Sequence, residues 1–220
     1  ESGRQVAAEV EALGRKTIFV RTDVTQQAST DAMTKAALDR FGRIDILVNN
    51  AGVGAAPGWA QRRELTNDDW DAVFAVNTFG IVHAMKSVEA HMQERRQGKI
   101  VNIASIAGRS GGGDLPHYSA SKAAAINVTQ AYALRLAKSN INVNAIAPGM
   151  VWTALTDLLM GKLKMSNPDA ASLSNREFFL KRATEQYPLG REITPEDIGK
   201  ACAFLVSDRA RNITGQTLNV

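Results

Sequence analysis

Short runs of β-branched and apolar residues alternate with helical segments along the whole chain, and this alternation constrains the fold more than any other feature of the sequence. Strands are expected at residues 17–20, 44–48, 100–104, 141–147 and 213–220. The 44–48 run is almost continuously apolar, as in strands that are buried on both faces of a parallel sheet. The chain has no internal repeat and no low-complexity linker, so the pattern predicts an α/β fold, an open doubly wound parallel sheet with helices on both faces.

Helix ends are marked by specific residues near the start of the chain. Val6, Val10 and Leu13 share one helical face, and Gly14 is placed to end that helix. A second helix is expected over residues 27–41, and Gly42, which follows directly, marks its end.

Later in the chain, Thr66 and Asp69 have the spacing of a capping box and predict the start of one long helix. Its apolar stripe consists of Trp70, Phe74, Ile81, Met85, Val88 and Met92. A further helix is expected over residues 118–137, and Thr194 followed by Pro195 predicts the start of another.

Composition narrows the class of protein. The 220 residues are 45% hydrophobic, enough for the core of one domain over residues 1–220, and no apolar run is long enough to predict a membrane span. The net charge of +4 comes from scattered basic residues, which argues against a nucleic-acid partner. With Cys202 as the single cysteine, no disulfide or cysteine-rich metal site is expected, and a reducing, cytoplasmic location is.

In open parallel sheets, ligands bind beyond the carboxyl ends of the strands, so the residues that follow each strand are candidates for a binding site. These residues are Asp23, the stretch 49–52, Ser105 and the stretch 148–153. Ser105 is also compatible with an ordinary loop serine, and Asp23 with a turn or helix-capping aspartate.

Tyr118 and Lys122 are four residues apart on a predicted helix, so their side chains share one face. An ammonium group close to a phenol favours the phenolate, which lowers a pKa that is ordinarily ~10 and suits the phenol to proton transfer. The spacing alone is weak evidence. Asn77 falls on the apolar stripe of its helix, where a buried amide needs hydrogen-bond partners, either structural or functional.

Together these motifs resemble those of the short-chain dehydrogenase/reductase family, in its single-domain form with a YxxxK active site. The resemblance covers essentially all 220 residues. In chain order the motifs are TDVT (22–25), NNAG (49–52), Asn77 in VNTFG, Ser105 in IVNIAS, YSASK (118–122), NAIAPGMVWT (144–153) and ITGQTLNV (213–220). The resemblance implies a Rossmann-type sheet and an oxidoreductase that transfers a hydride between a nicotinamide cofactor and a secondary alcohol or ketone.

The resemblance also implies roles for single residues. Tyr118 would be the general acid or base, and Lys122 would lower its pKa and hold the nicotinamide ribose. Ser105 would orient the carbonyl group, and Asn77 would anchor a water in a proton relay. The implied cofactor contacts are Asp23, Val24, Asn50, Ala51 and Gly52 for the adenosine half, and Pro148, Gly149, Val151 and Thr153 for the carboxamide end.

The family pattern includes a glycine-rich turn, TGxxxGxG, which these 220 residues do not contain. Such a turn cradles the cofactor pyrophosphate at a helix N-terminus. About 35 to 40 further residues, one strand-helix-strand unit, are therefore expected before Glu1, in a chain of roughly 260 residues. Because residues of that unit select the cofactor, it is expected to be NAD or NADP, with no preference assigned.

The substrate is expected to be a small molecule, and residues 154–191 to form a variable lid over it. Carbonyl reduction, of the 3-oxoacyl or another type, is favoured over polyol or sugar-alcohol oxidation. A catalytically silent NAD(P)-binding sensor is the alternative from another class. The resemblance also implies a homotetramer, and small residues of the 118–137 helix would permit close packing between copies: Ala120, Ala124, Ala131 and Ala137.

Two other motifs are rejected on the sequence. Gly52 and Gly54 follow a strand, but Pro57 stands where GxGxxG needs its last glycine. Residues 108–112 match the GxSxG motif of α/β-hydrolases, yet no histidine follows His117 to complete a triad.

Overall fold

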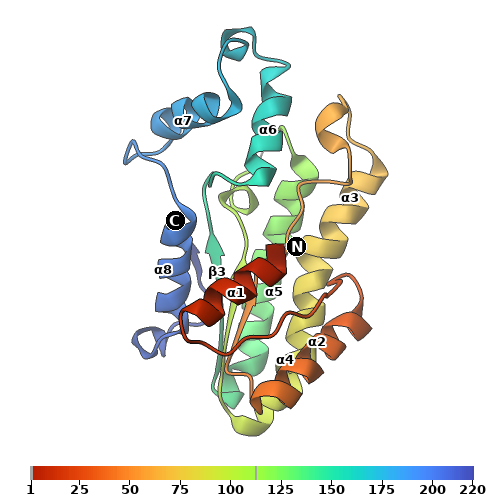
Figure 1. The fold of residues 1–220 in the computed structure, drawn as a ribbon, viewed down its shortest axis with the longest axis vertical. Helices are drawn as coiled ribbons and strands as arrows, with labels where there is room; N and C mark the ends of the chain where they lie inside the picture. Colours follow the sequence, from red (N-terminus) through yellow and green to blue (C-terminus); the bar gives the residue numbers. More distant parts are fainter. Residues whose placement is uncertain (1, 112) are drawn as a thin grey trace.

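Four parallel strands form one sheet in the order β1, β2, β3, β4 (Figure 1). The fold comes from a computed structural model that describes residues 2–111 and 113–220. The strands are β1 (Ile46–Asn49), β2 (Gly98–Ile103), β3 (Ile141–Ala147) and β4 (Thr217–Asn219). Leu47 lies beside Ile100, which in turn lies beside Val143. The predicted parallel α/β sheet is confirmed, and four of the five predicted strands are present.

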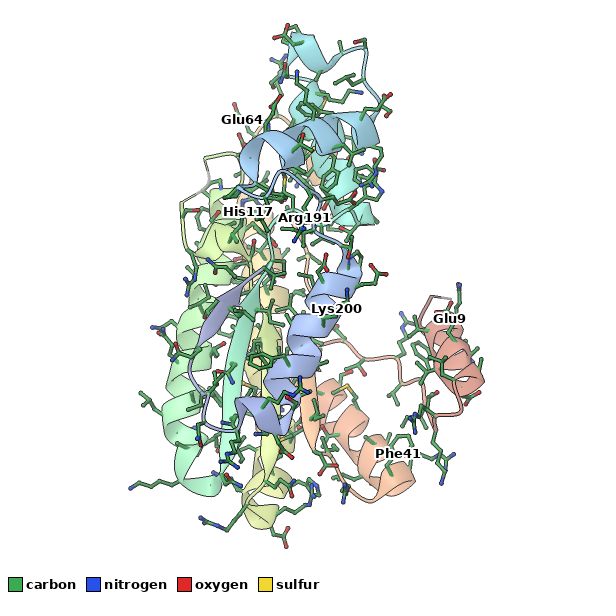
Figure 2. The ribbon with its side chains drawn as sticks, turned by 90° about the vertical axis from the view of Figure 1, so that its left-hand side faces the viewer. Glu9, Phe41, Glu64, His117, Arg191 and Lys200 are labelled. Atoms are coloured by element: carbon green, nitrogen blue, oxygen red, sulfur yellow. The ribbon has the colours of Figure 1, made fainter. Side chains whose placement is uncertain are left out.

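Helices cover both faces of the sheet. They are α2 (Gln27–Phe41), α4 (Gly80–Arg95) and α5 (Pro116–Leu136) on one face and α8 (Pro195–Val206) on the other (Figures 1 and 2). Successive residues of a strand point to opposite faces, so Ile100 packs in the core with α4 and α5 while Val101 packs against Leu205 of α8. All of β3 is buried, as its central position requires.

The predicted long helix is divided by a π-helical turn. Thr66 caps α3 (Asn67–Phe74) through the predicted capping box with Asp69. A π-helical turn, η2 (Ala75–Phe79), then leads into α4. The extra residue of a π-turn changes the phase of the helix face, and such turns often occur at functional sites. Asn77 lies in this turn and is fully buried, whereas Trp70 is exposed, contrary to its predicted place on the buried stripe.

The first part of the chain departs from the prediction. Helix α1 (Ser2–Ala12) ends before Gly14, which is left-handed as expected. However, Val6 is 56% and Leu13 79% exposed, so the predicted apolar face is not buried against the described residues. Figure 2 shows α1, labelled at Glu9, standing apart from the sheet and its helices.

The predicted strand at 17–20 is wrong for this structure. The backbone there is not assigned to a strand, and no described segment forms a sheet ladder with it. Extended residues become a strand only when a neighbour satisfies their N–H and C=O groups. Phe19 instead packs over Gly3 of α1.

Residues 154–191 form a cap above the sheet, built from α6 (Ala154–Lys164) and α7 (Asn175–Gln186) (Figure 1). The cap has an apolar cluster of its own, centred on Met160, Phe178 and Phe179. Most of the large apolar side chains of the cap therefore pack against one another, whereas Leu158 and Met165 are exposed.

Short 3₁₀ turns complete the fold. They are η1 (Trp59–Gln61), η3 (Ile106–Gly108), η4 (Ala137–Ser139), η5 (Pro168–Ala170) and η6 (Asp208–Ala210). Within the described residues, no helix combines the length and the apolar character needed to cross a membrane.

Candidate active site

A cavity of about 960 Å³ opens where β1, β2 and β3 end, below the cap. Its floor comes from residues that follow these strands, and its outer wall from α6 and α7. This is the edge at which open parallel sheets bind ligands. Among the predicted site residues, those that line the cavity are Asn50, Gly52, Ser105, Tyr118, Lys122, Pro148, Gly149, Val151 and Thr153.

Tyr118, Lys122 and Ser105 converge on one wall of the cavity. Tyr118 and Lys122 lie one turn apart near the start of α5, and the Lys122 Nζ is 5.7 Å from the centre of the Tyr118 ring. Lys122 is only 5% exposed, and its Nζ donates to the carbonyl oxygen of Ile103 at 2.8 Å. Ser105 follows β2 and accepts a hydrogen bond from the Ala107 N–H.

The protonation of these groups follows from their burial. Desolvation lowers the pKa of Lys122 from 10.5 to about 8, because a buried ammonium loses its hydration. Burial raises the pKa of Tyr118 above its ordinary value, and a hydrogen bond with Ser105 opposes part of that rise. This direction is opposite to the lowering predicted from Lys122, so in this structure the phenol keeps its proton at neutral pH.

Asn77 links Val53, in the loop after β1, to α5. Its Oδ1 accepts from the Val53 N–H at 2.9 Å, and its Nδ2 donates to the Val53 carbonyl at 2.9 Å and to the Ser121 hydroxyl at 3.1 Å. The Ser121 hydroxyl donates in turn to the carbonyl oxygen of Tyr118. The π-turn thus holds the loop after β1 in register with the helix that carries Tyr118.

Two glycines lie at this site, and one of them, Gly108, permits a close approach of two elements. A Cβ at Gly52 would lie 3.4 Å from the Asn77 Oδ1 and 3.5 Å from the Lys122 Nζ. A Cβ at Gly108 would lie 2.6 Å from the Lys122 carbonyl carbon, inside the contact distance of real Cβ atoms. Gly108 therefore lets η3 pack against the backbone of α5, which gives the GxSxG match a packing explanation. Gly112, the last residue of that match, lies outside the described residues.

The turn after β3 is braced from the cap. The Tyr187 hydroxyl donates to the Met150 carbonyl at 3.1 Å and accepts from the Met150 N–H. A Cβ at Gly149 would lie 2.9 Å from the same hydroxyl, so a larger residue there would have to displace the Tyr187 side chain. Thr153 caps α6, accepting from the Thr156 N–H.

Three of the predicted cofactor contacts, Asp23, Val24 and Ala51, do not line the cavity. The carboxylate of Asp23 accepts from the backbone and the side chain of Thr25, bonds that lower its pKa, in the turn before α2. Its geometry is that of the turn aspartate that was the alternative interpretation. The Val24 carbonyl is bonded to His83.

Sequence reasoning missed part of the wall. Trp59, Leu115, Leu159, Leu163, Arg182 and Gln186 line the cavity without belonging to any motif. These residues lie in stretches for which the sequence predicted no strand or helix, because those stretches show neither a period nor a motif.

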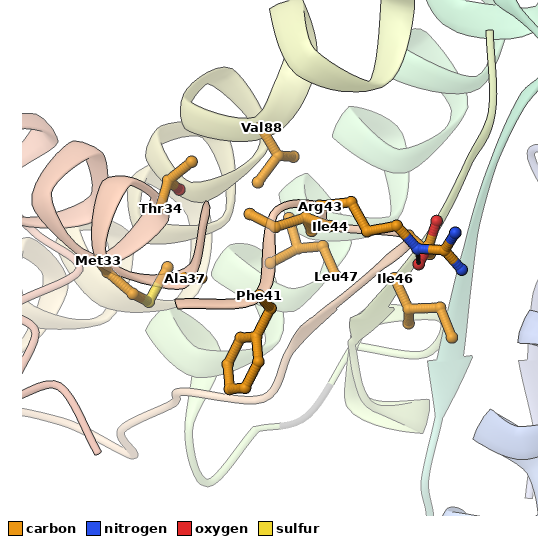
Figure 3. Close-up of a pocket in the computed structure, with 10 residues that line it drawn as sticks. Met33, Thr34, Ala37, Phe41, Arg43, Ile44, Ile46, Leu47 and Val88 are labelled. Carbon is orange, nitrogen blue, oxygen red and sulfur yellow. Dashed lines mark hydrogen bonds and ion pairs between the residues drawn. The ribbon is translucent and has the colours of Figure 1, made fainter. Parts of the chain in front are cut away.

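A second hollow of about 420 Å³ lies between α2 and β1 (Figure 3). Its wall is mostly apolar, and Asp45 there is paired with Arg43 and Arg95. It offers no group for acid–base chemistry. Over the part of the chain that the structure describes, no cluster of three or more His, Cys, Asp or Glu side chains forms a candidate metal site.

Comparisons with known proteins agree with this geometry. The family model described as enoyl-(acyl carrier protein) reductase matches residues 1–220. The (2S)-[(R)-hydroxy(phenyl)methyl]succinyl-CoA dehydrogenase subunit BbsD of Thauera aromatica is 37% identical over the whole chain and 81% of that protein. The 3-oxoacyl-[acyl-carrier-protein] reductase FabG of Chlamydia pneumoniae is 34% identical, with the same coverage.

Solved structures match as well. An actinorhodin polyketide ketoreductase with NADPH has a TM-score of 0.85 and 32% identity, covering 99% of this chain and 81% of the other. An NAD⁺-bound xylitol dehydrogenase has a TM-score of 0.84 and 29% identity, covering 99% of this chain and 83% of the other. The chain therefore belongs to the short-chain dehydrogenase/reductase family, the NAD(P)-dependent oxidoreductases of CH–OH groups.

Proposed function

We propose that the protein reduces a 3-oxoacyl-type ketone to a secondary alcohol, with Tyr118 as the proton donor. The observation that carries this proposal is the convergence of Tyr118, Ser105 and Lys122 on one wall of a single cavity. A phenol, a hydroxyl and an ammonium at one wall provide an acid, a carbonyl-orienting group and a cation for the same reaction.

The residues present fit the nicotinamide end of the cofactor. The Lys122 Nζ uses one of its three donors on Ile103, and the others remain for ribose hydroxyls. Gly52 leaves room for a flat ligand where a Cβ would meet both Lys122 and Asn77. We assign Asn50, Gly52, Pro148, Gly149, Val151 and Thr153 to cofactor contact. A bound NADH or NADPH would supply the hydride.

Tyr118 and Ser105 then act on the substrate oxygen. Ser105 donates to the carbonyl oxygen and fixes its direction, and Tyr118 transfers its proton to that oxygen as negative charge develops there. The raised pKa of Tyr118 keeps it protonated before the reaction. The ammonium of Lys122 stabilises the phenolate that remains on Tyr118. We assign to Asn77 the role of holding the Val53 loop against α5 while Tyr118 regains its proton.

The cavity wall favours an acyl ketone over a polyol. Its outer part is lined by Trp59, Leu155, Leu159 and Leu163, which bury apolar chains but give few partners to hydroxyl groups. Relatives named 3-oxoacyl-[acyl-carrier-protein] reductase and polyketide ketoreductase support the same class.

The same proposal extends to the whole protein. We place residues 1–220 in one domain whose cap, residues 154–191, covers the substrate, and the protein in a cytoplasmic setting, supported by its single cysteine, Cys202. We also propose a homotetramer assembled through α4 and α5, supported by the exposed side chains of Leu134 in α5 (83% exposed) and of Phe79, the last residue of η2 directly before α4 (56% exposed).

Turnover tests the proposal against a silent cofactor-binding sensor. The full protein would be mixed with NADH or NADPH and a panel of 3-oxoacyl thioesters and simple ketones, and separately with NAD⁺ or NADP⁺ and a panel of polyols, and nicotinamide absorbance followed. Oxidation of the cofactor is expected with the thioesters first. Tight cofactor binding with no turnover across the panel would establish the sensor, and turnover of polyols alone would establish the polyol dehydrogenase.

A further inference from the structure

One cationic side chain of the cap lines the cavity without a partner for its charge. Arg182 of α7 is partly buried and faces the cavity together with Gln186, one helical turn later. The Arg182 Nε is buried, and within residues 2–111 and 113–220 it has no hydrogen-bond acceptor. The guanidinium lies over the ring of Phe178, 5.6 Å from its centre, which fixes one face of it.

The acids near Arg182 are engaged elsewhere or stay in solvent. On its own helix, Glu177 completes the capping box with Ser174, and Glu185 is exposed and forms no ion pair with Arg182. The neighbouring Arg176 shows the contrasting case, because both of its terminal nitrogens bind Glu192. Arg182 has no such carboxylate among the described residues.

The other charged side chains that line the cavity belong to segments outside the cap. Lys122 is on α5 and bonded to Ile103, and Asp114 is exposed on the loop before α5. The cap also contributes the apolar side chains of Leu155, Leu159 and Leu163, from α6, to the cavity wall. The cavity is therefore lined by Tyr118, Ser105 and Lys122 from α5 and the end of β2, and by apolar side chains and one cation from the cap.

From this arrangement we propose that Arg182, assisted by Gln186, binds a carboxylate at the far end of the substrate, so that the substrate is a ketone or alcohol whose acyl chain ends in an acid. The proposal rests on the proposed function, since it names the substrate class of the same site. A planar guanidinium donates two parallel hydrogen bonds to a carboxylate, and the amide one turn away adds another donor.

A matched pair of substrates tests the proposal. The 3-oxoadipyl thioester of N-acetylcysteamine ends in a carboxylate, and its methyl ester is neutral and of similar shape. Arg182→Gln is expected to raise KM for the acid about 10 to 100-fold and to change KM for the ester little, as for the loss of a charged hydrogen bond. Lys181→Gln, which removes a charge from the same helix outside the cavity, is expected to change neither.

A separate substrate tests whether the anion that Arg182 binds is a phosphate instead of a carboxylate. A 4′-phosphopantetheine thioester of a neutral 3-oxoacyl chain carries the anion at the opposite end of the substrate. If Arg182→Gln weakens this substrate and spares the 3-oxoadipyl acid, the proposal is overturned. Equal losses for acid and ester, or an equal effect of Lys181→Gln, also overturn it, because they indicate a structural role or long-range charge.

Binding separates this proposal from the proposed function. Adipyl N-acetylcysteamine thioester lacks the ketone and cannot be reduced, and its binding would be followed by the fluorescence of the tryptophans, of which Trp59 lines the cavity. If wild type turns over no substrate, the proposed function fails, while Arg182-dependent binding of this probe still supports the carboxylate site. Binding that is unchanged in Arg182→Gln contradicts the site whatever the turnover.

Discussion

At the scale of single residues, the buried ammonium of Lys122 destabilises the fold but lies where the proposed reaction needs a cation. A buried ammonium that has one hydrogen bond, to Ile103, is held at the cost of its hydration, and its pKa falls to about 8. The same position leaves its remaining donors available at the cavity wall. Lys122, which would hold the ribose, therefore occupies a position where a buried charge is unfavourable for folding.

The effect of Lys122 on stability has a definite sign. Between pH 8 and 10.5 the unfolded chain binds the Lys122 proton and the folded chain releases it, so unfolding free energy rises with pH in that window. The shift corresponds to about 3 kcal/mol. Below pH 8 both states are protonated, and this contribution stays constant at its least favourable value.

Lys122→Met is expected to remove that rise. Urea unfolding of wild type and variant between pH 7 and 10.5 measures it, and subtracting the two curves cancels the other titrating groups. The variant should be at least as stable as wild type near pH 7 and should lose that advantage as pH rises, while its reductase activity is lost. Parallel curves across the window would show that Lys122 has an ordinary pKa.

The site residues that could be predicted from the sequence are those that belong to a motif. Tyr118 and Lys122 share a helix face by spacing, and Ser105 follows a strand, so their convergence was predictable. Arg182 was not, because nothing in residues 154–191 shows which face of α7 meets the cavity. The bracing role of the Tyr187 hydroxyl was not predictable either, since its bonds to Met150 span 37 positions in the chain.

At the scale of elements, the site depends on how closely η3 and α5 pack. Gly108 sits against the backbone of Lys122, and Asn77 in the π-turn ties the Val53 loop to the same helix. The capping box at Thr66 predicted where α3 starts, but no residue pattern predicted the π-turn. Such a turn is set by tertiary hydrogen bonds, here those of Asn77, more than by local propensity.

Gly108→Ala is expected to disturb this packing, because its Cβ would lie 2.6 Å from the Lys122 carbonyl carbon. Overpacking of this kind costs about 1 to 3 kcal/mol. Thermal unfolding should show a lower Tm and assays a lower kcat. Gly111→Ala is the matched control, since among the described residues no atom beyond the chain neighbours lies within 4 Å of its Cβ position. Equal Tm values for both variants would contradict the close approach.

At the scale of the whole molecule, the α/β architecture could be predicted from the alternation of strands and helices, but which predicted strands pair in the sheet could not. Residues 17–20 have the composition of a strand and no partner among the described residues, so they remain outside the sheet. Periodicity reports which residues suit a strand, whereas a ladder also requires a neighbour. The apolar face of α1 is exposed in the same region.

Assembly is predicted at the same scale. Ala120, Ala124, Ala131 and Leu134 recur along one side of α5, and Leu134 is 83% exposed. Light scattering of the full protein is expected to give a tetramer, and Leu134→Glu to dissociate it by placing a charge in the interface. A wild-type monomer at micromolar concentration would contradict this assembly.

The central claim is that Tyr118 delivers the proton during carbonyl reduction in this cavity. Turnover of a 3-oxoacyl thioester by wild type and Tyr118→Phe, with cofactor binding measured in parallel, tests it most directly. Loss of a general acid is expected to lower kcat about 10² to 10⁴-fold, while the cofactor still binds, because Phe keeps the ring and removes only the hydroxyl. A Tyr118→Phe protein that binds cofactor and turns over at the wild-type rate would contradict the claim.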